Sequence, residues 1–347
     1  MRRKEQAIDY FRRQRIFFCQ AEGNPEPQRH LEDTIQRVRT YYFNFSFDRD
    51  FPGKDIVAPP PWQPQTVSAH ANASDVATFF RYVLNYYPLE ENTSQYNSTI
   101  VSIEDNTPGE HPDAFWSADY QYAFFGQQRI FNSNQDCHEL CCYAVAKDIV
   151  AHEFTHALTT WTVGLDYSGE SGALDESYAD IFAILIKNFP NRNIEQWNWE
   201  IGTGFGTDGS ALRSLQYPNQ YHTTIFFNGN NQKINHPEHL SNYYELQWTR
   251  EQDWGGVHIN CGIHNKAAYN LLNSKSERDG KYIFKPKIAS EIFYQALTQL
   301  RPDSGFSDSR RAIRNTIATL YRHSSSRERE ERLRAIANAF DEVGISE

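Results

Sequence analysis

The segment His152-Glu153-Phe154-Thr155-His156 carries the residue types that metal-assisted hydrolysis requires. It lies within an apolar run, residues 144–163, which predicts a buried helix ending at Gly164. Four residues advance a helix by about 400°, so the two imidazoles would lie on one face, one turn apart, and could bind one zinc ion. Glu153 would then lie close enough to accept a proton from water at that ion without ligating the metal.

A third ligand is needed, because a catalytic zinc takes three protein groups and keeps one position open. The next predicted helix, residues 173–189, offers Glu176, with Asp180 one turn further along the same face. A solvated helix face is the ordinary explanation for such an acidic pair, but the neighbouring residues are apolar and a buried carboxylate needs a partner. We therefore predict Glu176 as a zinc ligand and Asp180 as an acceptor for an imidazole N–H.

The motif on its own has a plain alternative, a helix that carries two histidines without function. Three fixed residues in ~345 windows match by chance in roughly 4 of 100 chains of this length. The surrounding sequence argues against chance. Residues 152–182, HEFTHALTTWTVGLDYSGESGALDESYADIF, resemble the active-site segment of the thermolysin-like neutral metallopeptidases, including their protealysin branch. The resemblance continues in GSALRSL, QDWGGVHINCGIHNKAAY, IASEIFYQALTQL and AFDEVGI, and it covers about residues 113–345.

The resemblance implies a zinc site and a set of groups that act on the substrate. The zinc ligands would be His152, His156 and Glu176, with Glu153 as the general base. The remaining implied roles are oxyanion stabilisation by Tyr167 and His258, orientation of His258 by Asp253, and binding of a substrate carbonyl by Arg213. A phenol and an imidazolium are suitable donors to an oxygen that becomes negative in the transition state.

The implied fold is α+β, a two-lobed zincin with a strand-rich N-terminal lobe, a helical C-terminal lobe and the active site in the cleft between them. We expect three segments. Residues 1–65 are divergent and form either the edge of the N-terminal lobe or a short pro-segment. Residues 66–157 form the strand-rich lobe and end in the zinc-binding helix, and residues 158–347 form the helical lobe.

Local patterns predict further elements. Residues 99–131 are rich in β-branched and aromatic side chains, which favours strands. Apolar spacing predicts a helix capped by Ser74, and three more around residues 288–297, 313–320 and 333–340. The apolar positions between residues 31 and 38 also have helical spacing, and the proline-rich run 58–64 predicts an extended linker.

The activity implied by the resemblance is a zinc-dependent endopeptidase that cleaves on the amino side of hydrophobic residues. The apolar pocket for that residue would be lined by Ile149, Ile201 and Leu212. A zinc aminopeptidase is one alternative, although its glutamate lies one residue closer and its Gly-Ala-Met-Glu-Asn motif is absent here. A catalytically impaired member that binds peptides or a protein partner is the other, and the presence of both Glu153 and His258 argues against it.

One departure from the family pattern concerns the substrate. The family's Asn-Ala-Phe-Trp motif stands here as Asp113-Ala114-Phe115-Trp116. An aspartate lacks the amide donor unless it is protonated, so this change bears on how the peptide backbone binds.

Two insertions add groups that could bind metal. CHELCC contains Cys137, His138, Cys141 and Cys142, for which free thiols or a disulfide are a better explanation than a second metal. A polar insertion contains His222, His236 and His239, which we expect in surface loops because none has ligand spacing on a helix.

The well-known relatives depend on calcium, and position-by-position matching implies that this chain does not. Asp148 and Glu200 keep their carboxylates, whereas other calcium positions hold Lys187, Asn198, Thr203 and Ser210. Calcium needs six to eight oxygen ligands, so we expect Lys187 to pair with Asp148 in place of the ion. The alternative is that Lys187 points to solvent and one weak calcium ion stays on Asp148 and Glu200.

The composition of the chain limits the kinds of partner that it can bind. The chain of 347 residues has a formal charge of −10, which argues against nucleic acid because phosphate binding needs a basic face. No run reaches the ~20 apolar residues of a membrane-spanning helix. The charged N-terminus lacks the apolar segment of a signal peptide, so cytoplasmic location and non-classical export stay open beside the secretion that the resemblance implies. We expect a monomer acting on peptide or protein substrates.

Overall fold

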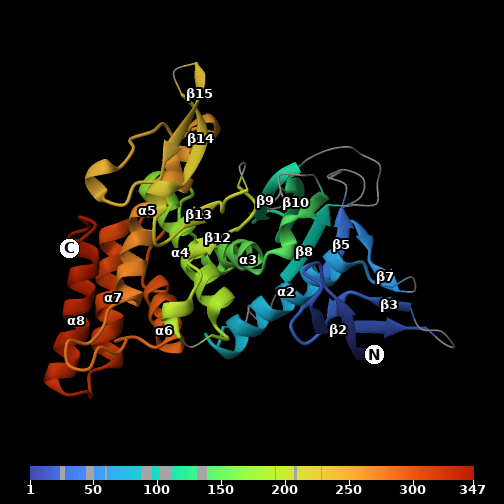
Figure 1. Cartoon of the computed structure of the whole chain (residues 1–347), viewed down its shortest axis with the longest axis horizontal. Coiled ribbons are helices and arrows are strands. Elements are labelled where there is room, and N and C mark those ends of the chain that lie inside the picture. The colour runs from blue at the N-terminus through green and yellow to red at the C-terminus, as the bar shows by residue number, and fades with distance from the viewer. Residues whose placement is uncertain are drawn as a thin grey trace. The chain divides into compact units, whose positions relative to one another are not determined.

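The computed structural model describes residues 1–23, 28–43, 51–58, 61–86, 96–101, 111–130, 139–191, 193–206, 209–227 and 229–347. The chain forms two compact units, whose elements are labelled in Figure 1. Unit 1 comprises Met1–Ala157 and Gly202–Ser210, and unit 2 comprises Leu158–Ile201 and Ala211–Glu347. None of the described helices is both long enough and apolar enough to cross a membrane.

Unit 1 contains two sheets in its described part. Its strands are β1 (Arg2–Ile8), β2 (Gln14–Glu22), β3 (Gln28–His30), β4 (Glu32–Asp33), β5 (Val38–Phe43), β6 (Lys54–Asp55), β7 (Val57–Ala58), β8 (Tyr96–Val101), β9 (His111–Ser117), β10 (Tyr122–Ile130) and β11 (Glu139–Cys142). One sheet has the order β1-β2-β3-β7. The other has the order β11-β10-β8-β5-β4, with β6 on β5 and β9 on β10, and its β5–β8 and β8–β10 pairs are parallel. The strands predicted within residues 99–131 are confirmed for the described residues, and residues 102–110 and 131 lie outside them.

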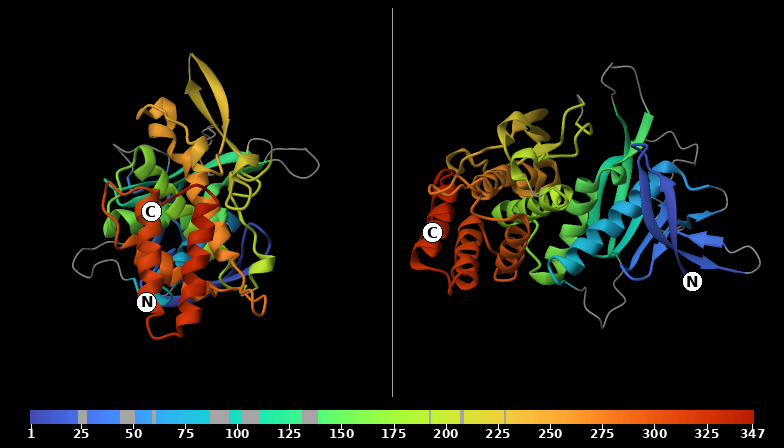
Figure 2. Two further views of the ribbon diagram at one scale, coloured as in Figure 1. Left: turned by 90° about the vertical axis from the view of Figure 1, so that its left-hand side faces the viewer. Right: turned by 60° about the horizontal axis from the view of Figure 1, so that its bottom comes forward.

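Helix α2 (Pro64–Tyr82) packs against β2, β5 and β8 (Figure 2). It begins ten residues before the predicted cap, and Ser74 lies in its interior. The proline-rich run therefore does not stay extended to its end, because a proline suits the first helical position, where no N–H partner is needed. Asn72 donates to the carbonyl oxygens of Ala144 and Val145, both at 3.0 Å, and so attaches α2 to the chain just before the next helix.

Residues 31–38, whose apolar positions have helical spacing, do not form a helix. These residues form β4, a turn and the start of β5, with Leu31 and Val38 in the core. A few apolar positions fit either period, and pairing with β8 decides in favour of the strand.

Helix α3 (Lys147–Thr162) begins in unit 1, and its last residues belong to unit 2. Unit 2 contains α4 (Gly169–Asn188), α5 (Asp253–Leu272), α6 (Pro286–Leu297), α7 (Phe306–Leu320) and α8 (Ser326–Asp341). The helices predicted from the apolar pattern are confirmed, whereas that pattern does not predict α5. Helix α4 is buried on nearly every side and packs against α5 along its length.

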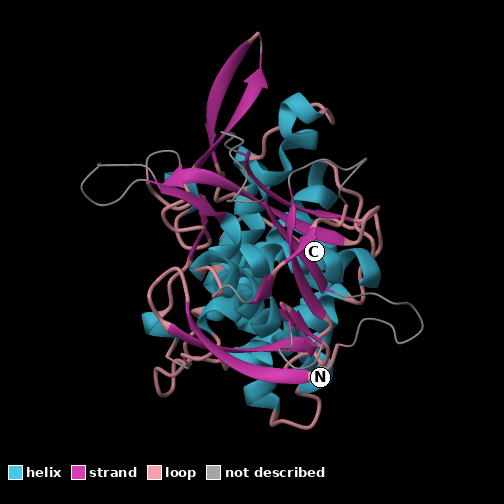
Figure 3. Cartoon of the chain, turned by 90° about the vertical axis from the view of Figure 1, so that its right-hand side faces the viewer, coloured by secondary structure: helices cyan, strands magenta, loops and turns pink. Residues whose placement is uncertain are grey.

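Two small hairpins complete the described part of unit 2, β12 (Glu200–Ile201) with β13 (Arg213–Ser214) and β14 (His222–Phe227) with β15 (Asn230–Asn235). Figure 3 shows the second as a long ribbon. His236, expected in a surface loop, is instead buried directly after β15, where Nε2 lies 2.9 Å from Oγ1 of Thr223. Burial lowers the pKa of His236 to about 3, so its imidazole is neutral.

A second neutral histidine joins three helices in the core of unit 2. Nδ1 of His264 lies 2.7 Å from Oγ of Ser177 on α4, and Nε2 lies 2.9 Å from Oγ of Ser309 on α7. The ring also stacks on Phe306. Burial lowers the pKa of His264 to about 3, because no charged partner offsets the cost of desolvating an imidazolium.

This histidine should make the protein acid-labile. The unfolded chain binds a proton at His264 below its ordinary pKa of 6.5, whereas the native chain does not until about pH 3. The contribution of His264 to stability is therefore fully present above pH 6.5 and falls by up to about 1.4 kcal/mol per pH unit below it. We expect His264→Gln to be less stable than the wild type at pH 7.5, with a difference that shrinks between pH 6.5 and 4.

Urea unfolding followed by circular dichroism at a series of pH values measures this difference. His323→Gln, at an exposed position, is the matched control and should unfold like the wild type. A difference between His264→Gln and the wild type that is the same at pH 7.5 and pH 4.5 would contradict the assignment of a neutral buried imidazole.

Candidate metal and catalytic site

Three of the predicted ligands converge. His152 and His156 lie one turn apart on α3, and Glu176 lies on α4. Each offers one ligand atom, and these atoms all lie within 4.8 Å of one another. The two Nε2 atoms are 3.1 Å apart. The helical period of α3 and the burial of the apolar α4 thus produce the juxtaposition expected from the sequence.

This arrangement fits a zinc ion. A metal at ~2.0–2.1 Å from two nitrogens in tetrahedral geometry holds them ~3.3 Å apart, close to the separation seen here. Two imidazoles and one carboxylate form the ligand set typical of a catalytic zinc, which leaves a fourth position for water or substrate. Glu153, between the two histidines in sequence, is buried with them.

The ligand Glu176 shares the interior with a second carboxylate, Asp180, one turn further along α4. Arg213 of β13 holds Asp180 with two short contacts, Nε to Oδ2 and Nη2 to Oδ1, both 2.8 Å, and its Nη2 lies 3.6 Å from Oε2 of Glu176. Asn265 of α5 donates to the same Asp180 carboxylate at 2.8 Å. Burial alone would lower the pKa of Arg213, but these carboxylates outweigh it and raise the pKa.

Arg213 and Asp180 have partners in the structure that differ from those expected from the sequence. Arg213, expected to hold a substrate carbonyl, has its guanidinium engaged by Asp180. Asp180, expected to accept from a ligand imidazole, accepts from Arg213 and Asn265. Both expected roles stay predictions, and the observed pairing adds the stabilisation of a buried charge.

Tyr167 and His258 lie beside the ligand carboxylate. The Tyr167 hydroxyl donates to Oε1 of Glu176 at 2.5 Å, and Nε2 of His258 lies 3.3 Å from both that oxygen and the Tyr167 hydroxyl. Two donors therefore converge on one side of the ligand set. Desolvation of the hydroxyl and the charge of Glu176 raise the pKa of Tyr167 well above its ordinary value, so its hydroxyl keeps its proton.

Asp253 holds His258 from within the same stretch of chain. Its Oδ1 lies 2.6 Å from Nδ1 of His258, and its Oδ2 accepts from the backbone N–H of His258 at 2.9 Å. Burial would lower the pKa of His258, but the carboxylates of Glu176 and Asp253 outweigh it and raise the pKa to about 9. Asp253 thus holds the Nδ1 side of the imidazole, and Nε2 faces Glu176.

The chain around Asp253 is left-handed. Four successive residues, Asp253, Trp254, Gly255 and Gly256, have φ values of 55°, 52°, 94° and 77°. Glycine adopts this region readily and a bulky side chain does not, so Trp254 is a local outlier. This turn leads into the right-handed part of α5 and places Asp253 against His258.

The residues predicted to bind the substrate belong to both units. Asp113 is exposed on β9, and Ala114 pairs with Phe125 of β10. Ile149 is buried on α3, and in unit 2 the N–H of Leu212 donates to the carbonyl of Ile201 at 2.9 Å. Their binding roles stay predictions.

Only part of the CHELCC insertion lies within the described residues. Cys137 and His138 lie outside them, so a second metal there stays untested. Cys142 is buried at the end of β11, and burial raises the pKa of its thiol to about 12, which keeps it protonated.

Two residues of α5 support the site and do not stand out in the sequence. Asn265 binds Asp180, and Cys261, three residues after His258, places Sγ 3.2 Å from the His258 carbonyl oxygen. Their spacing of three and seven from His258 is the helical signal that points to them. The glycines before His258 and the mixture of polar and apolar residues after it hide this signal, because they give no clear amphipathic pattern.

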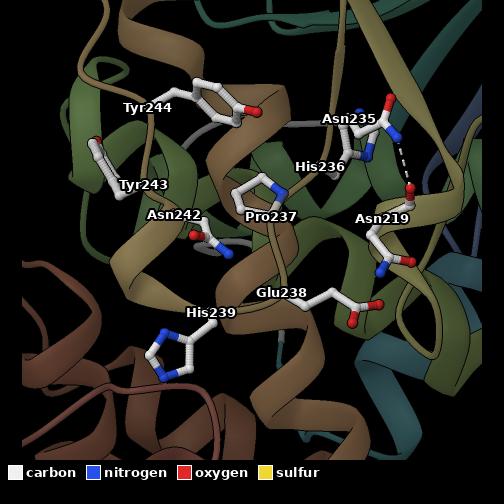
Figure 4. A pocket seen from close by; sticks show the side chains of 9 residues that line it. All are labelled: Asn219, Asn235, His236, Pro237, Glu238, His239, Asn242, Tyr243 and Tyr244. Atoms are coloured by element: carbon white, nitrogen blue, oxygen red, sulfur yellow. Dashed lines mark hydrogen bonds between the residues drawn. The ribbon is translucent and has the colours of Figure 1, made fainter.

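A pocket of about 590 Å³ also lies in unit 2, next to the hairpin of β14 and β15 (Figure 4). It is lined by Asn219, Asn235, His236, Pro237, Glu238, His239, Asn242, Tyr243 and Tyr244. Asn235 donates across its edge to the Asn219 carbonyl at 3.0 Å. The lining includes none of the residues predicted to bind zinc or act on the substrate.

The α+β elements and the set of two histidines and one glutamate are those expected of the zincin class. Comparison with known proteins agrees. The thermolysin metallopeptidase catalytic domain matches residues 27–160, and the thermolysin metallopeptidase alpha-helical domain matches residues 163–345. The chain therefore belongs to the thermolysin metallopeptidase family.

Individual relatives are distant. The chain is 33% identical over 287 residues to the thermostable neutral protease NprT of Geobacillus stearothermophilus, covering 81% of this chain and 46% of that protein. It is 28% identical over 317 residues to a zinc metalloproteinase of Listeria monocytogenes, covering 89% and 52%. The chain thus spans about half the length of the curated relatives it matches. The solved structure of the precursor of protealysin from Serratia proteamaculans has a similar fold, with a TM-score of 0.65 at 24% identity, covering 89% of this chain and 87% of that one.

Proposed function

We propose that this chain is a zinc-dependent endopeptidase that acts on peptide or protein substrates as a monomer. The observation that carries the proposal is the convergence of the two Nε2 atoms and the Glu176 carboxylate within 4.8 Å of one another. Two further donors, Tyr167 and His258, lie within 3.3 Å of that carboxylate. Zinc bound here would supply a Lewis acid that lowers the pKa of water and polarises a peptide carbonyl.

The residues of the chain supply the proton transfers and the remaining donors. Glu153 accepts the proton of the attacking water and delivers it to the leaving amine. Tyr167 and protonated His258 donate hydrogen bonds to the carbonyl oxygen as it becomes negative. Asp253 holds the imidazole in the orientation that presents Nε2–H, and its charge favours the protonated form.

We propose cleavage on the amino side of a hydrophobic residue, received by Ile149, Ile201 and Leu212. Asp113 and Ala114 would bind the substrate backbone, and Arg213 would contact a substrate carbonyl beside the cleavage site while paired with Asp180. The exposed carboxylate of Asp113 favours substrates with a donor group there, since an ionised aspartate only accepts hydrogen bonds.

Glu153→Gln should retain zinc and lose peptidase activity, because the change removes the base and no ligand. Glu176→Ala should instead lose zinc, because it removes a ligand. Elemental analysis and casein hydrolysis, with and without a zinc chelator, measure both. Near-normal turnover by Glu153→Gln would refute the mechanism, and casein hydrolysis that persists under zinc chelation would refute the role of the metal.

His258→Ala should lower kcat/KM by roughly 100- to 1000-fold, the range for losing one donor to an oxyanion. Its zinc content should stay at one ion per chain. The matched control is His323→Ala, at an exposed position, which should behave like the wild type. Loss of zinc in parallel with activity would show that His258 supports the metal site and is not a donor to the transition state.

We propose that stability does not depend on calcium. Lys187 donates from Nζ to the backbone carbonyl of Glu200 at 3.0 Å, so an ammonium group lies next to the backbone of one of the two residues that keep a carboxylate. A bound cation would be disfavoured beside it. The pairing of Lys187 with Asp148 stays a prediction.

Thermal melts in millimolar calcium and in a calcium-selective chelator should therefore give the same Tm within about 2 °C, since only an ion bound to the native state raises it. Lys187→Met should lower Tm in both conditions, because it removes the donor to Glu200. A shift of several degrees between calcium and chelator would refute the proposal.

A further inference from the structure

Two large indoles are exposed beside Tyr167 and His258. Trp248 is 69% exposed and Trp254 is 43% exposed. Indole rings are usually buried when their only role is packing, and exposed aromatic surface marks recognition sites. Trp254 directly follows Asp253, whose carboxylate holds His258. Trp254 is therefore adjacent in sequence to the residue that orients His258.

The loop that carries both indoles is preformed. Asn260 of α5 is fully buried, accepts from the N–H of Tyr244 at 2.9 Å and donates to the carbonyls of Tyr244 and Gly255. Within the loop, Gln252 accepts from the N–H of Gln247 at 2.9 Å. A surface fixed in this way loses little conformational entropy when a ligand binds.

Trp248 lies next to the turn that carries Tyr167. A Cβ on Gly169, two residues after Tyr167, would lie 3.1 Å from Nε1 of Trp248, and a Cβ on Gly255 would lie 2.8 Å from its Cδ1. Both glycines have positive φ. The indole thus lies against two backbone segments, one leading from Tyr167 and one leading to His258, and its other face is open to solvent.

Trp254 occupies a backbone conformation that disfavours it. Its φ of 52° and ψ of 33° are left-handed, a region where asparagine, aspartate and glycine are common and bulky residues are rare. Strain of this kind gathers at functional sites. In this conformation the indole is exposed on the same loop as Trp248.

We propose that Trp248 and Trp254 form a subsite for an aromatic side chain of the peptide substrate, separate from the pocket of Ile149, Ile201 and Leu212. The inference rests on the proposed endopeptidase function and adds a specificity to it. Stacking on an indole favours a planar ring over an aliphatic side chain of similar size.

The test uses quenched fluorescent peptides with leucine fixed directly after the cut and phenylalanine or alanine at each of the neighbouring positions. The wild type should prefer phenylalanine at one of these positions by about tenfold in kcat/KM. Trp248→Ala and Trp254→Asn should each reduce this ratio at least about threefold. Trp248→Phe should keep it, because a ring remains. Asparagine accepts the left-handed backbone, so Trp254→Asn should unfold at the Tm of the wild type or above it.

Tyr82→Ala, at a 63% exposed aromatic of α2, is the matched control and should leave the ratio unchanged. Equal losses on the phenylalanine and alanine peptides, or no phenylalanine preference at any position, would overturn the proposal. A wild-type dimer that Trp248→Ala converts to a monomer in light scattering would assign the surface to a second copy of the chain, and would also overturn it.

Failure of the proposed function can be distinguished from failure of the subsite. Titration of zinc-loaded Glu153→Gln with the same peptides measures binding without cleavage. Tighter binding of the phenylalanine peptide that is lost in Glu153→Gln/Trp248→Ala would support the subsite even if the wild type cleaves nothing. Equal binding of both peptides by Glu153→Gln would overturn it.

Discussion

Two carboxylates buried one turn apart on α4 constrain the rest of the site. Glu176 and Asp180 are both fully buried, and two like charges at this spacing repel each other in a medium of low dielectric. They can stay ionised only if positive charge and hydrogen-bond donors surround them. Arg213 and Asn265 supply both to Asp180, and the Tyr167 hydroxyl supplies a donor to Glu176. A divalent metal at Glu176 would supply the remaining charge, which is why a metal and an arginine belong to the same arrangement.

The packing of α4 on α5 follows from this requirement. Asn265 reaches Asp180 only if the two helices lie close, and Gly172 of α4 permits this, since a Cβ there would lie 2.6 Å from Cγ1 of Val257 and 2.9 Å from the carbonyl carbon of Tyr167. The same close approach brings His258, one residue after Val257, within 3.3 Å of Glu176. Hence one helix–helix contact places both Asn265, which stabilises the buried charge of Asp180, and His258, which is proposed to act on the substrate.

The sequence predicts what depends on short-range periodicity. The histidine spacing on α3 and the carboxylates on α4 are local patterns, so the residue order alone is enough to predict the ligand set. Long-range contacts are not predictable in this way. Arg213 carries no local sign that its partner is Asp180, and a histidine in a polar insertion gives no indication that the fold buries it, as it does His236. Helix α2 illustrates a third case, because its start at Pro64 rather than near Ser74 depends on packing against β2, β5 and β8.

The metal ligands and His258 are positioned by different kinds of contact. The metal ligands sit on α3 and α4, whose positions depend on burial of both helices, so any change in packing moves them. The orientation of His258, in contrast, is set within residues 253–258. The left-handed turn reverses the chain so that both oxygens of Asp253 face His258, one binding its ring and one its backbone N–H. Gly255 and Gly256 allow this turn, while Trp254 adopts it at a cost. The orientation of the imidazole therefore depends on contacts within residues 253–258, whereas the convergence of the metal ligands depends on the packing of two helices.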